Sequence, residues 1–349
     1  MSCDFQELGV IGRGAFGEAM LVQATGSGKQ YVMKQISLLG LNSDQAENIF
    51  AEADALQLLD HPNIVKCHRC WINATAKSTD AHAAHKEQLI SLPLRSSLLK
   101  WPGSHDNSAY AIPKSLHMLL ELADGGSLDR VISNCHTHME EFLLGIWIAQ
   151  MLLGLLHMHE THLIHRDLKP ANIFVTRTGI IKIGDLGGSQ HIRDLSEECS
   201  SQYGSPLYMC PEVWSRGQCS AKSDIWSLGC VAYELLQLFP PFQMPCLTER
   251  VLHAQPLPLP TTYSLKLRGL IMSMLHKDPA KRPTTHQLVE NAYISNCIRD
   301  WVLLSTSQHS SDQLGMNHNM NSANKMVPGR EKMQHYMHDM CKMSWQTEY

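Results

Sequence analysis

Asp167, Lys169 and Asn172 form a polar group in the segment HRDLKPAN, which lies between the apolar pair Leu163-Ile164 and the strand-like run IFV. A carboxylate such as that of Asp167 can orient an attacking hydroxyl and accept its proton. A lysine two residues later can neutralise charge on a transferred phosphoryl group, and an amide oxygen can bind Mg²⁺. Any one of these could be an ordinary turn residue, but together with the residues described next they indicate phosphoryl transfer to a hydroxyl, with Asp167 and Lys169 as catalytic residues.

Asp185, Lys34 and Glu52 supply the other groups that this chemistry needs. Asp185 follows the strand-like run IIKIG and is predicted, with Asn172, to bind Mg²⁺, which prefers carboxylate, amide and phosphate oxygens. Lys34 lies on the strand-like run QYVMKQI, where its charge can hold nucleotide phosphates, and Glu52 on the next predicted helix is its expected partner. A lone strand lysine is more often a solvated surface residue, but the order of the other residues favours the catalytic interpretation.

A glycine-rich loop follows the first predicted strand. Glycines let a backbone turn tightly and approach phosphates without collisions of Cβ atoms. In a dinucleotide-binding fold the GxGxxG pattern would open a helix, whereas here the strand-like run EAMLVQA comes next. We therefore predict a hairpin over the phosphates and reject the dinucleotide-binding fold. The predicted nucleotide-binding residues of the loop are Ile11, Gly12, Arg13, Gly14, Ala15, Phe16 and Gly17.

The elements that must position these residues fall into two parts. Three strands are expected in the first 35 residues, where apolar residues alternate, and two more at 63–72 and 116–122. Residues 43–59 change to helical spacing. From residue 127 to about 302 the pattern is mostly helical. The sequence thus predicts an α+β protein with a small antiparallel sheet lobe and a larger helical lobe. The apolar stripe of the first helix is Ile49, Ala53, Leu56 and Leu59.

Two segments lack a clear pattern. Residues 73–115 are rich in His, Ser, Ala and Lys and are broken by prolines, which predicts a long loop insert in the sheet lobe. Residues 303–349 are rich in Ser, Asn, His and Met and are predicted to be a mostly disordered tail. The predicted boundaries are therefore 1–121 for the sheet lobe, 122–302 for the helical lobe and 303–349 for the tail.

Composition argues against several other classes of protein. A net charge of −4 gives no reason to expect nucleic acid as a partner. The apolar run 142–158 is almost long enough to cross a membrane, but Gln150 interrupts it, and a buried core helix is the favoured interpretation. The 11 cysteines form no framework and are predicted to be reduced thiols of a cytoplasmic protein. The CxxC at 67–70 has no second pair, which favours structural thiols over a zinc site.

The motifs together resemble those of a eukaryotic protein kinase over about residues 5–298. In chain order they are GRGAFGEA, VMK, HRDLKPAN, DLG, CPE, SDIWSLG and KRP. The segments HPNIV, YVMKQI and GSPLYMCPE are similar to the NIMA-related serine/threonine group. The resemblance implies the bilobal kinase fold, ATP and Mg²⁺ as cofactors, and protein substrates with Ser or Thr acceptors. It also implies a cell-cycle role, or one associated with the cytoskeleton or flagellum.

The resemblance assigns further residues. Ala19 and Val32 would contact adenine from the sheet, and the backbone from Glu121 to Ala123 would bind its edge. Glu212 would pair with Arg282 beneath the activation segment, and Asp224 would brace the catalytic loop. The serine of GSP, next to the acceptor, and Lys169 favour serine/threonine substrates.

Regulation by phosphorylation is expected from Arg166, which precedes the catalytic aspartate and could pair with a phosphate in the activation segment. Ser201 is the first candidate for that phosphate and Ser200 the second, with an upstream kinase or autophosphorylation as its source. The less favoured alternative is that either serine is only an exposed loop residue.

A pseudokinase scaffold is the alternative from another class of function. Pseudokinases usually lack the lysine, the catalytic aspartate or the metal aspartate, whereas this chain keeps Lys34, Asp167, Asn172 and Asp185. An active enzyme is therefore the favoured hypothesis.

Overall fold

The computed structural model describes residues 5–14, 17–75, 87–91, 112–200 and 204–313. The chain divides into two compact units, and each is described by itself. The N-terminal unit contains the residues up to Leu122 together with Asp185–Ser189. Of the described residues, the C-terminal unit contains Ala123–Gly184 and those from Gln190 to Gln313.

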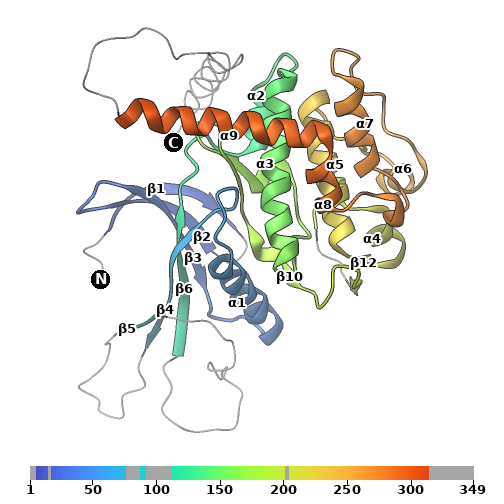
Figure 1. The fold of residues 1–349 in the computed structure, drawn as a ribbon. Coiled ribbons are helices and arrows are strands. Elements are labelled where there is room, and N and C mark those ends of the chain that lie inside the picture. Colours follow the sequence, from blue (N-terminus) through green and yellow to red (C-terminus); the bar gives the residue numbers. More distant parts are fainter. Residues whose placement is uncertain (1–4, 15–16, 76–86, 92–111, 201–203, 314–349) are drawn as a thin grey trace, which may run out of the picture. The chain divides into compact units, whose positions relative to one another are not determined.

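An antiparallel sheet of six strands forms the N-terminal unit, in the order β1-β2-β3-β6-β4-β5 (Figure 1). Its strands are β1 (Phe5–Arg13), β2 (Gly17–Ala24), β3 (Gln30–Ser37), β4 (Cys67–Thr75), β5 (Glu87–Ser91) and β6 (Ile112–Glu121). The predicted antiparallel sheet is confirmed, with five strands close to their expected positions.

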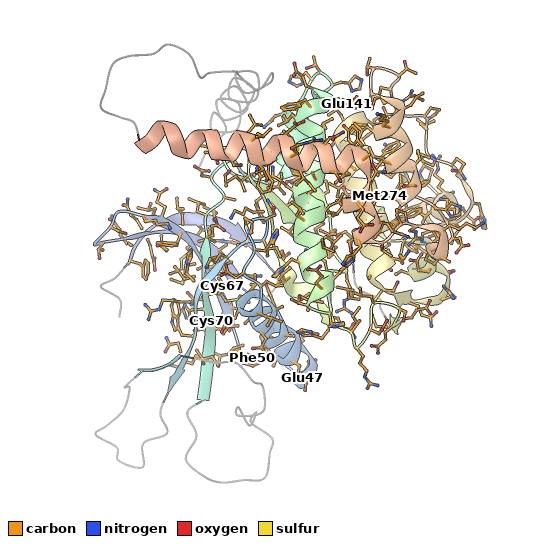
Figure 2. All side chains as sticks on the ribbon, viewed as in Figure 1. Glu47, Phe50, Cys67, Cys70, Glu141 and Met274 are labelled. Atoms are coloured by element: carbon orange, nitrogen blue, oxygen red, sulfur yellow. The ribbon has the colours of Figure 1, made fainter. Side chains whose placement is uncertain are left out.

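Helix α1 (Ser43–Leu58) is the one helix of the N-terminal unit with α geometry among the described residues. Its first turn is closed by a capping box, in which Gln45 N donates to Asn42 Oδ1 at 2.8 Å and Asn42 N to Gln45 Oε1 at 3.0 Å. The predicted apolar face is buried, as is Phe50, whereas Glu47 is exposed to solvent (Figure 2).

The insert at 73–115 was predicted to be a loop throughout, and this is wrong at three places. β4 continues to Thr75, β6 begins at Ile112, and the short strand β5 pairs with β4 between them. Five residues are too few for an alternating pattern to stand out, and the strand forms because β4 offers an edge whose backbone groups need partners. Residues 76–86 and 92–111 lie outside the described residues.

The C-terminal unit is mainly helical, as predicted. Three two-stranded ladders accompany the helices: β7 (Leu163–Ile164) with β10 (Gln190–His191), β8 (Ile173–Val175) with β9 (Ile181–Ile183), and β11 (Cys199–Ser200) with β12 (Gln218–Cys219). Its helices are α2 (Leu128–Asn134), α3 (Glu141–Glu160), α4 (Pro211–Arg216), α5 (Ala221–Gln237), α6 (Leu247–His253), α7 (Leu265–Met274), α8 (Thr285–Glu290) and α9 (Ala292–Gln313).

Helix α3 runs through the centre of this unit and packs against α5, α8 and α9 (Figure 1). Among the described residues it is the only helix long and apolar enough to cross a membrane, and most of its side chains are buried in the unit. Its start is tied to the start of α7, because Glu141 accepts bonds from Ser264 N at 2.7 Å and Ser264 Oγ at 2.5 Å (Figure 2 labels Glu141). Burial on most sides explains why the run is apolar all round.

Helix α9 corrects the predicted boundary of the tail. The tail was expected to begin at residue 303, but α9 continues to Gln313. Leu304 is buried, so tertiary packing continues beyond the point where the sequence turns polar and supports the helix there. The rest of the expected tail, from 314, lies outside the described residues.

Candidate active site

Asp224, in the first turn of α5, holds the catalytic loop of the C-terminal unit in place. Its Oδ2 accepts a bond from the backbone N–H of His165 and its Oδ1 one from that of Arg166, both at 2.9 Å. His159 on α3 adds a third bond, from Nε2 to Oδ2 at 3.0 Å. Arg166 has a φ of 67°, a strained conformation that two such bonds can hold. The predicted bracing role of Asp224 is confirmed.

The ionised state of Asp224 follows from these contacts. Burial raises the pKa of its carboxyl group, but the hydrogen bond from His159, together with the electrostatic attraction of His159 and His165 and the backbone hydrogen bond of His165, outweighs burial and the net pKa is lowered. An ionised acceptor makes stronger bonds to backbone N–H groups than a neutral one. The loop that carries Asp167 is therefore fixed by charge-assisted bonds.

His165 links this brace to the next residue of the loop. Its Nδ1 accepts a bond from Asp167 N at 3.2 Å, which leaves Nε2 to donate to Gly184 O at 3.2 Å. The imidazole is completely buried, and both ring nitrogens have partners. Through His165, the backbone of Asp167 is thus connected to Gly184, the residue that directly follows β9.

Asp167, Lys169, Asn172 and Ser205 form one hydrogen-bonded network in the C-terminal unit. Lys169 Nζ donates to Asp167 Oδ2 at 2.7 Å and to Ser205 Oγ at 2.8 Å. Ser205 N donates to Asp167 Oδ1 at 2.8 Å, and Asn172 Nδ2 donates to Asp167 O at 2.9 Å and to Oδ2 at 3.2 Å. The segment GSP is therefore in contact with the carboxylate that the sequence selected as the base.

The side-chain amide of Asn172 is oriented so that its oxygen could bind a metal ion. Because its nitrogen makes both bonds to Asp167, its oxygen is the atom that remains for a cation, as a Mg²⁺ ligand requires. The short helix η1 (Pro170–Asn172) begins with proline, whose fixed φ suits a first helical position. Asn172 is placed by this turn, and the residue fits its predicted role.

Lys34, Glu52 and Asp185 come together in the N-terminal unit. Lys34 Nζ lies 2.5 Å from Glu52 Oε1 and 3.5 Å from Asp185 Oδ1. Burial lowers the pKa of Lys34, but the two carboxylates outweigh it and the net pKa is raised, so the amine stays charged. About half of the Asp185 side chain is exposed (48%), which leaves carboxylate surface for a cation. The predicted partner of Lys34 is correct.

The turn after Asp185 forms part of the same unit. Asp185 has a φ of 54°, and the helical turn η2 (Leu186–Gly188) follows it. A Cβ atom at Gly187 would lie 3.4 Å from Glu52 Oε2 and 3.5 Å from Asp185 Oδ1. A glycine at this position thus lets the backbone lie beside the two carboxylates.

The glycine-rich segment forms a hairpin of β1 and β2, as predicted. Gly12 lies opposite Ala19 and Arg13 opposite Glu18, and Gly14 N donates to Gly17 O at 2.8 Å. A strand therefore follows the motif, which excludes the dinucleotide-binding fold for this segment. Ile11 is a large apolar residue that is 40% exposed. The predicted residues Ala15 and Phe16 lie outside the described residues.

The residues predicted to contact adenine are placed only in part. Val32 on β3 lies opposite Leu120 on β6, and Ala19 on β2 lies opposite Lys34. The N–H of Glu121 already donates to Lys66 O at 2.9 Å, so this N–H is engaged within the sheet. Ala123 begins the C-terminal unit. Adenine binding by these residues stays a prediction.

The regulatory residues are described incompletely. Arg166 Nη1 donates to Gln190 Oε1 at 2.5 Å, a partner on β10 that the sequence did not indicate. Ser200 belongs to β11, and Ser201 lies outside the described residues. His159 was also missed as a partner of Asp224. No motif marks Gln190 or His159, since their roles depend on which elements pack together.

A comparison with known protein families shows which family the chain belongs to. The sequence pattern of the family described as "Protein kinase domain" matches residues 5–294. The chain belongs to the protein kinase family. The resemblance found in the sequence is thereby confirmed.

Three relatives of this kinase are serine/threonine-protein kinase Nek4 and serine/threonine-protein kinase Nek3 of Mus musculus and cytokinesis protein sepH of Aspergillus niger. Nek4 is 32% identical over 293 residues, which are 83% of this chain and 32% of Nek4. Nek3 is 32% identical over 79% of this chain and 46% of its own length. The protein sepH is 33% identical over 85% of this chain and 19% of its own length. This kinase thus spans less than half the length of each of the three.

Proposed function

We propose that the chain is an active protein serine/threonine kinase, which transfers the γ-phosphate of ATP to Ser or Thr hydroxyls of protein substrates. The observation that carries the proposal is the network in which Asp167 contacts Lys169, Asn172 and Ser205. Asp167 would orient the acceptor hydroxyl and accept its proton. Lys169 would offset negative charge on the phosphoryl group during transfer.

The N-terminal unit supplies the groups suited to binding ATP. Lys34, held by Glu52, would bind the phosphates as a fixed positive charge, and the β1–β2 hairpin would cover them. Asp185 in this unit and Asn172 in the C-terminal unit each carry an oxygen of the kind that Mg²⁺ prefers, and each would serve as a ligand of that ion. When bound, Mg²⁺ neutralises phosphate charge and aligns the phosphates for transfer.

A role near that of the NIMA-related kinases is the finer part of the proposal. Nek4 and Nek3 are named as serine/threonine kinases and sepH as a cytokinesis protein, and the latter name supports a function in the cell cycle. A role at the cytoskeleton or flagellum rests only on the resemblance of the sequence to the NIMA-related group. A cytoplasmic location fits such a function. Control by an upstream kinase or by autophosphorylation, acting through Arg166, belongs to the same proposal.

The alternative is a kinase-shaped scaffold that binds partners without transferring phosphate. Such a chain would tolerate loss of contacts to the catalytic aspartate, whereas here both oxygens of Asp167 and its carbonyl accept bonds. The scaffold therefore ranks second.

The deciding experiment is phosphate transfer from Mg²⁺-ATP to casein by the purified chain, with Asp167→Asn as the matched control. Transfer by the native chain that the variant loses by about 100-fold or more supports the kinase, because general-base contributions are of that order. Absence of transfer by both proteins, also after treatment with an activating kinase, would refute the enzyme and leave the scaffold. Nucleotide binding by both proteins should be measured in parallel, because it shows that the variant is folded.

A further inference from the structure

Cys199 and Cys219 face each other across the β11–β12 ladder of the C-terminal unit. The two residues are direct partners in an antiparallel register, and their Sγ atoms lie 2.7 Å apart, so that one thiol donates to the other. Directly opposed residues of antiparallel strands have Cα atoms about 4.5–5.5 Å apart. A disulfide spans Cα separations of about 4.4–6.8 Å. The backbone therefore already has the spacing that a disulfide needs.

An apolar cluster holds both side chains. Ile164, Ile192 and Ala221 are buried around the pair. Cys219 is 2% exposed and Cys199 is 9% exposed, so a small reagent can reach Cys199 more easily. The packing restrains both thiols next to each other and makes Cys199 the sulfur that reacts first.

The surroundings of Cys199 lower the pKa of its thiol, unlike those of Cys210 and Cys297. The hydrogen bond from Cys219 and the guanidinium of Arg166 lower the pKa of Cys199 to about 7, against the opposing effects of burial and Asp224. Burial instead raises the pKa of Cys210 to about 12 and that of Cys297 to about 11. Because the thiolate is the reactive form, Cys199 is set apart as the nucleophile.

We propose that Cys199 and Cys219 are a peroxide-sensitive pair that forms a reversible disulfide. Hydrogen peroxide is the oxidant. The thiolate of Cys199 attacks one peroxide oxygen, the S–O bond forms as the O–O bond breaks, and hydroxide leaves. The thiol of Cys219 then attacks the sulfenic sulfur, the S–S bond forms, and water leaves. Two thiols and one peroxide thus give one disulfide and two waters, and a dithiol reductant reverses the change.

The cross-link would close the loop from 199 to 219, which contains Ser205 and helix α4. Ser205 contacts both Asp167 and Lys169, so the disulfide joins the segment next to the catalytic network to the strand that precedes α5. Fixing this loop in the observed pairing should keep those contacts and raise the thermal stability of the unit. The thiol chemistry itself does not depend on the proposed kinase activity.

The test uses the full chain, reduced and then treated with a slight excess of hydrogen peroxide and quenched with an alkylating reagent. We expect two fewer alkyl groups than in the reduced control and a peptide in which Cys199 is joined to Cys219, and dithiothreitol added before the quench should reverse both. The melting temperature should rise by about 5 °C or more, as a cross-link of this loop length predicts. Recovery of both cysteines as alkylated thiols, or oxidation of Cys199 without a cross-link to Cys219, would overturn the proposal.

Two variants separate the pair from general oxidation. Cys246→Ser removes an exposed cysteine and should leave the cross-link unchanged, whereas Cys219→Ser should abolish it and leave Cys199 as a sulfenic acid that dimedone traps. Because Cys219→Ser could also weaken the fold, the peptide map of the native chain remains the deciding measurement. An equal yield of cross-links to Cys246 in the native chain would contradict a dedicated pair.

Discussion

Arg282 and Glu212 form a bidentate ion pair inside the C-terminal unit, with Nη1 2.6 Å from Oε1 and Nη2 2.7 Å from Oε2. Arg282 is only 1% exposed, and it also donates to backbone carbonyls of Lys222, His276 and Lys277. The pair thus fixes the start of α4 to the residues that follow α7. The pairing that the kinase resemblance implied is confirmed.

Removal of one partner should destabilise the protein strongly. Arg282→Met leaves a buried carboxylate without its cation, and such losses cost about 3–5 kcal/mol. We expect a large fall in the free energy of unfolding, measured by urea denaturation of the chain. The double variant Glu212→Gln with Arg282→Met should lose less than the sum of the two single variants. Strict additivity would contradict a direct interaction between the two side chains.

Acid should weaken the same pair. Burial raises the pKa of Glu212, but Arg282 outweighs burial and the net pKa lies below the ordinary value of 4.5. The contribution of the pair is therefore present above pH 4.5 and is lost as the pH falls through the lowered pKa. The melting temperature should decline below about pH 4.5. The melting temperature of the Glu212→Gln/Arg282→Met double variant should decline less than that of the native chain. An equal decline in both proteins would show that other carboxylates cause the loss of stability.

Asp224→Asn should impair the catalytic loop without removing any residue proposed to touch substrate. The amide keeps one acceptor oxygen but places an NH₂ group against a backbone N–H of His165 or Arg166, each of which donates to the carboxylate now. An unsatisfied buried donor costs about 1–3 kcal/mol. We expect a lower melting temperature and a fall in kcat of about tenfold or more, with a smaller change in KM for ATP. An unchanged kcat would show that the loop holds its shape without Asp224.

Local signals selected residues that the structure places in contact, Asp167 with Lys169 and Asn172, and Lys34 with Glu52, and long-range packing explains the contacts that they missed. Asp167, Lys169 and Asn172 all lie within the eight-residue segment HRDLKPAN, and one short turn of the backbone brings their side chains together. Glu52 could be predicted as the partner of Lys34 because the helical spacing of residues 43–59 shows which side of that helix Glu52 occupies. The roles of Gln190 and His159 arise only when distant elements pack.

The fold shows the same division between local and long-range information. Apolar spacing marked α1, and alternation marked β1, β2 and β3. Strand β5 depends on an edge that β4 provides, and the continuation of α9 past residue 303 accompanies the burial of Leu304. Neither contact leaves a periodic pattern in its own segment. The pairing of Cys199 with Cys219 was not predicted for the same reason, because 19 residues separate the two cysteines in the chain.

The glycines of the β1–β2 hairpin should respond differently to alanine. A Cβ atom at Gly17 would overlap the backbone carbonyl of Gln35, whereas at Gly14 its nearest neighbour is Gly17 O at 3.8 Å. Gly17→Ala should therefore lower the melting temperature. Gly14→Ala should keep it and raise KM for ATP, because the added methyl group would hinder approach to the phosphates. Equal effects of both variants on stability would contradict this separation.

Ser205 provides a test of how the acceptor segment is held against the catalytic residues. Its Oγ accepts a bond from the charged Lys169 amine at 2.8 Å, and hydrogen bonds to charged groups contribute about 1.5–3 kcal/mol. Ser205→Ala should therefore lower kcat/KM for a protein substrate by about 10- to 100-fold. Ser205→Thr keeps the hydroxyl and should stay near the native value. Both variants keep the backbone N–H that binds Asp167, so equal losses in the two would assign the effect to packing rather than to the hydroxyl.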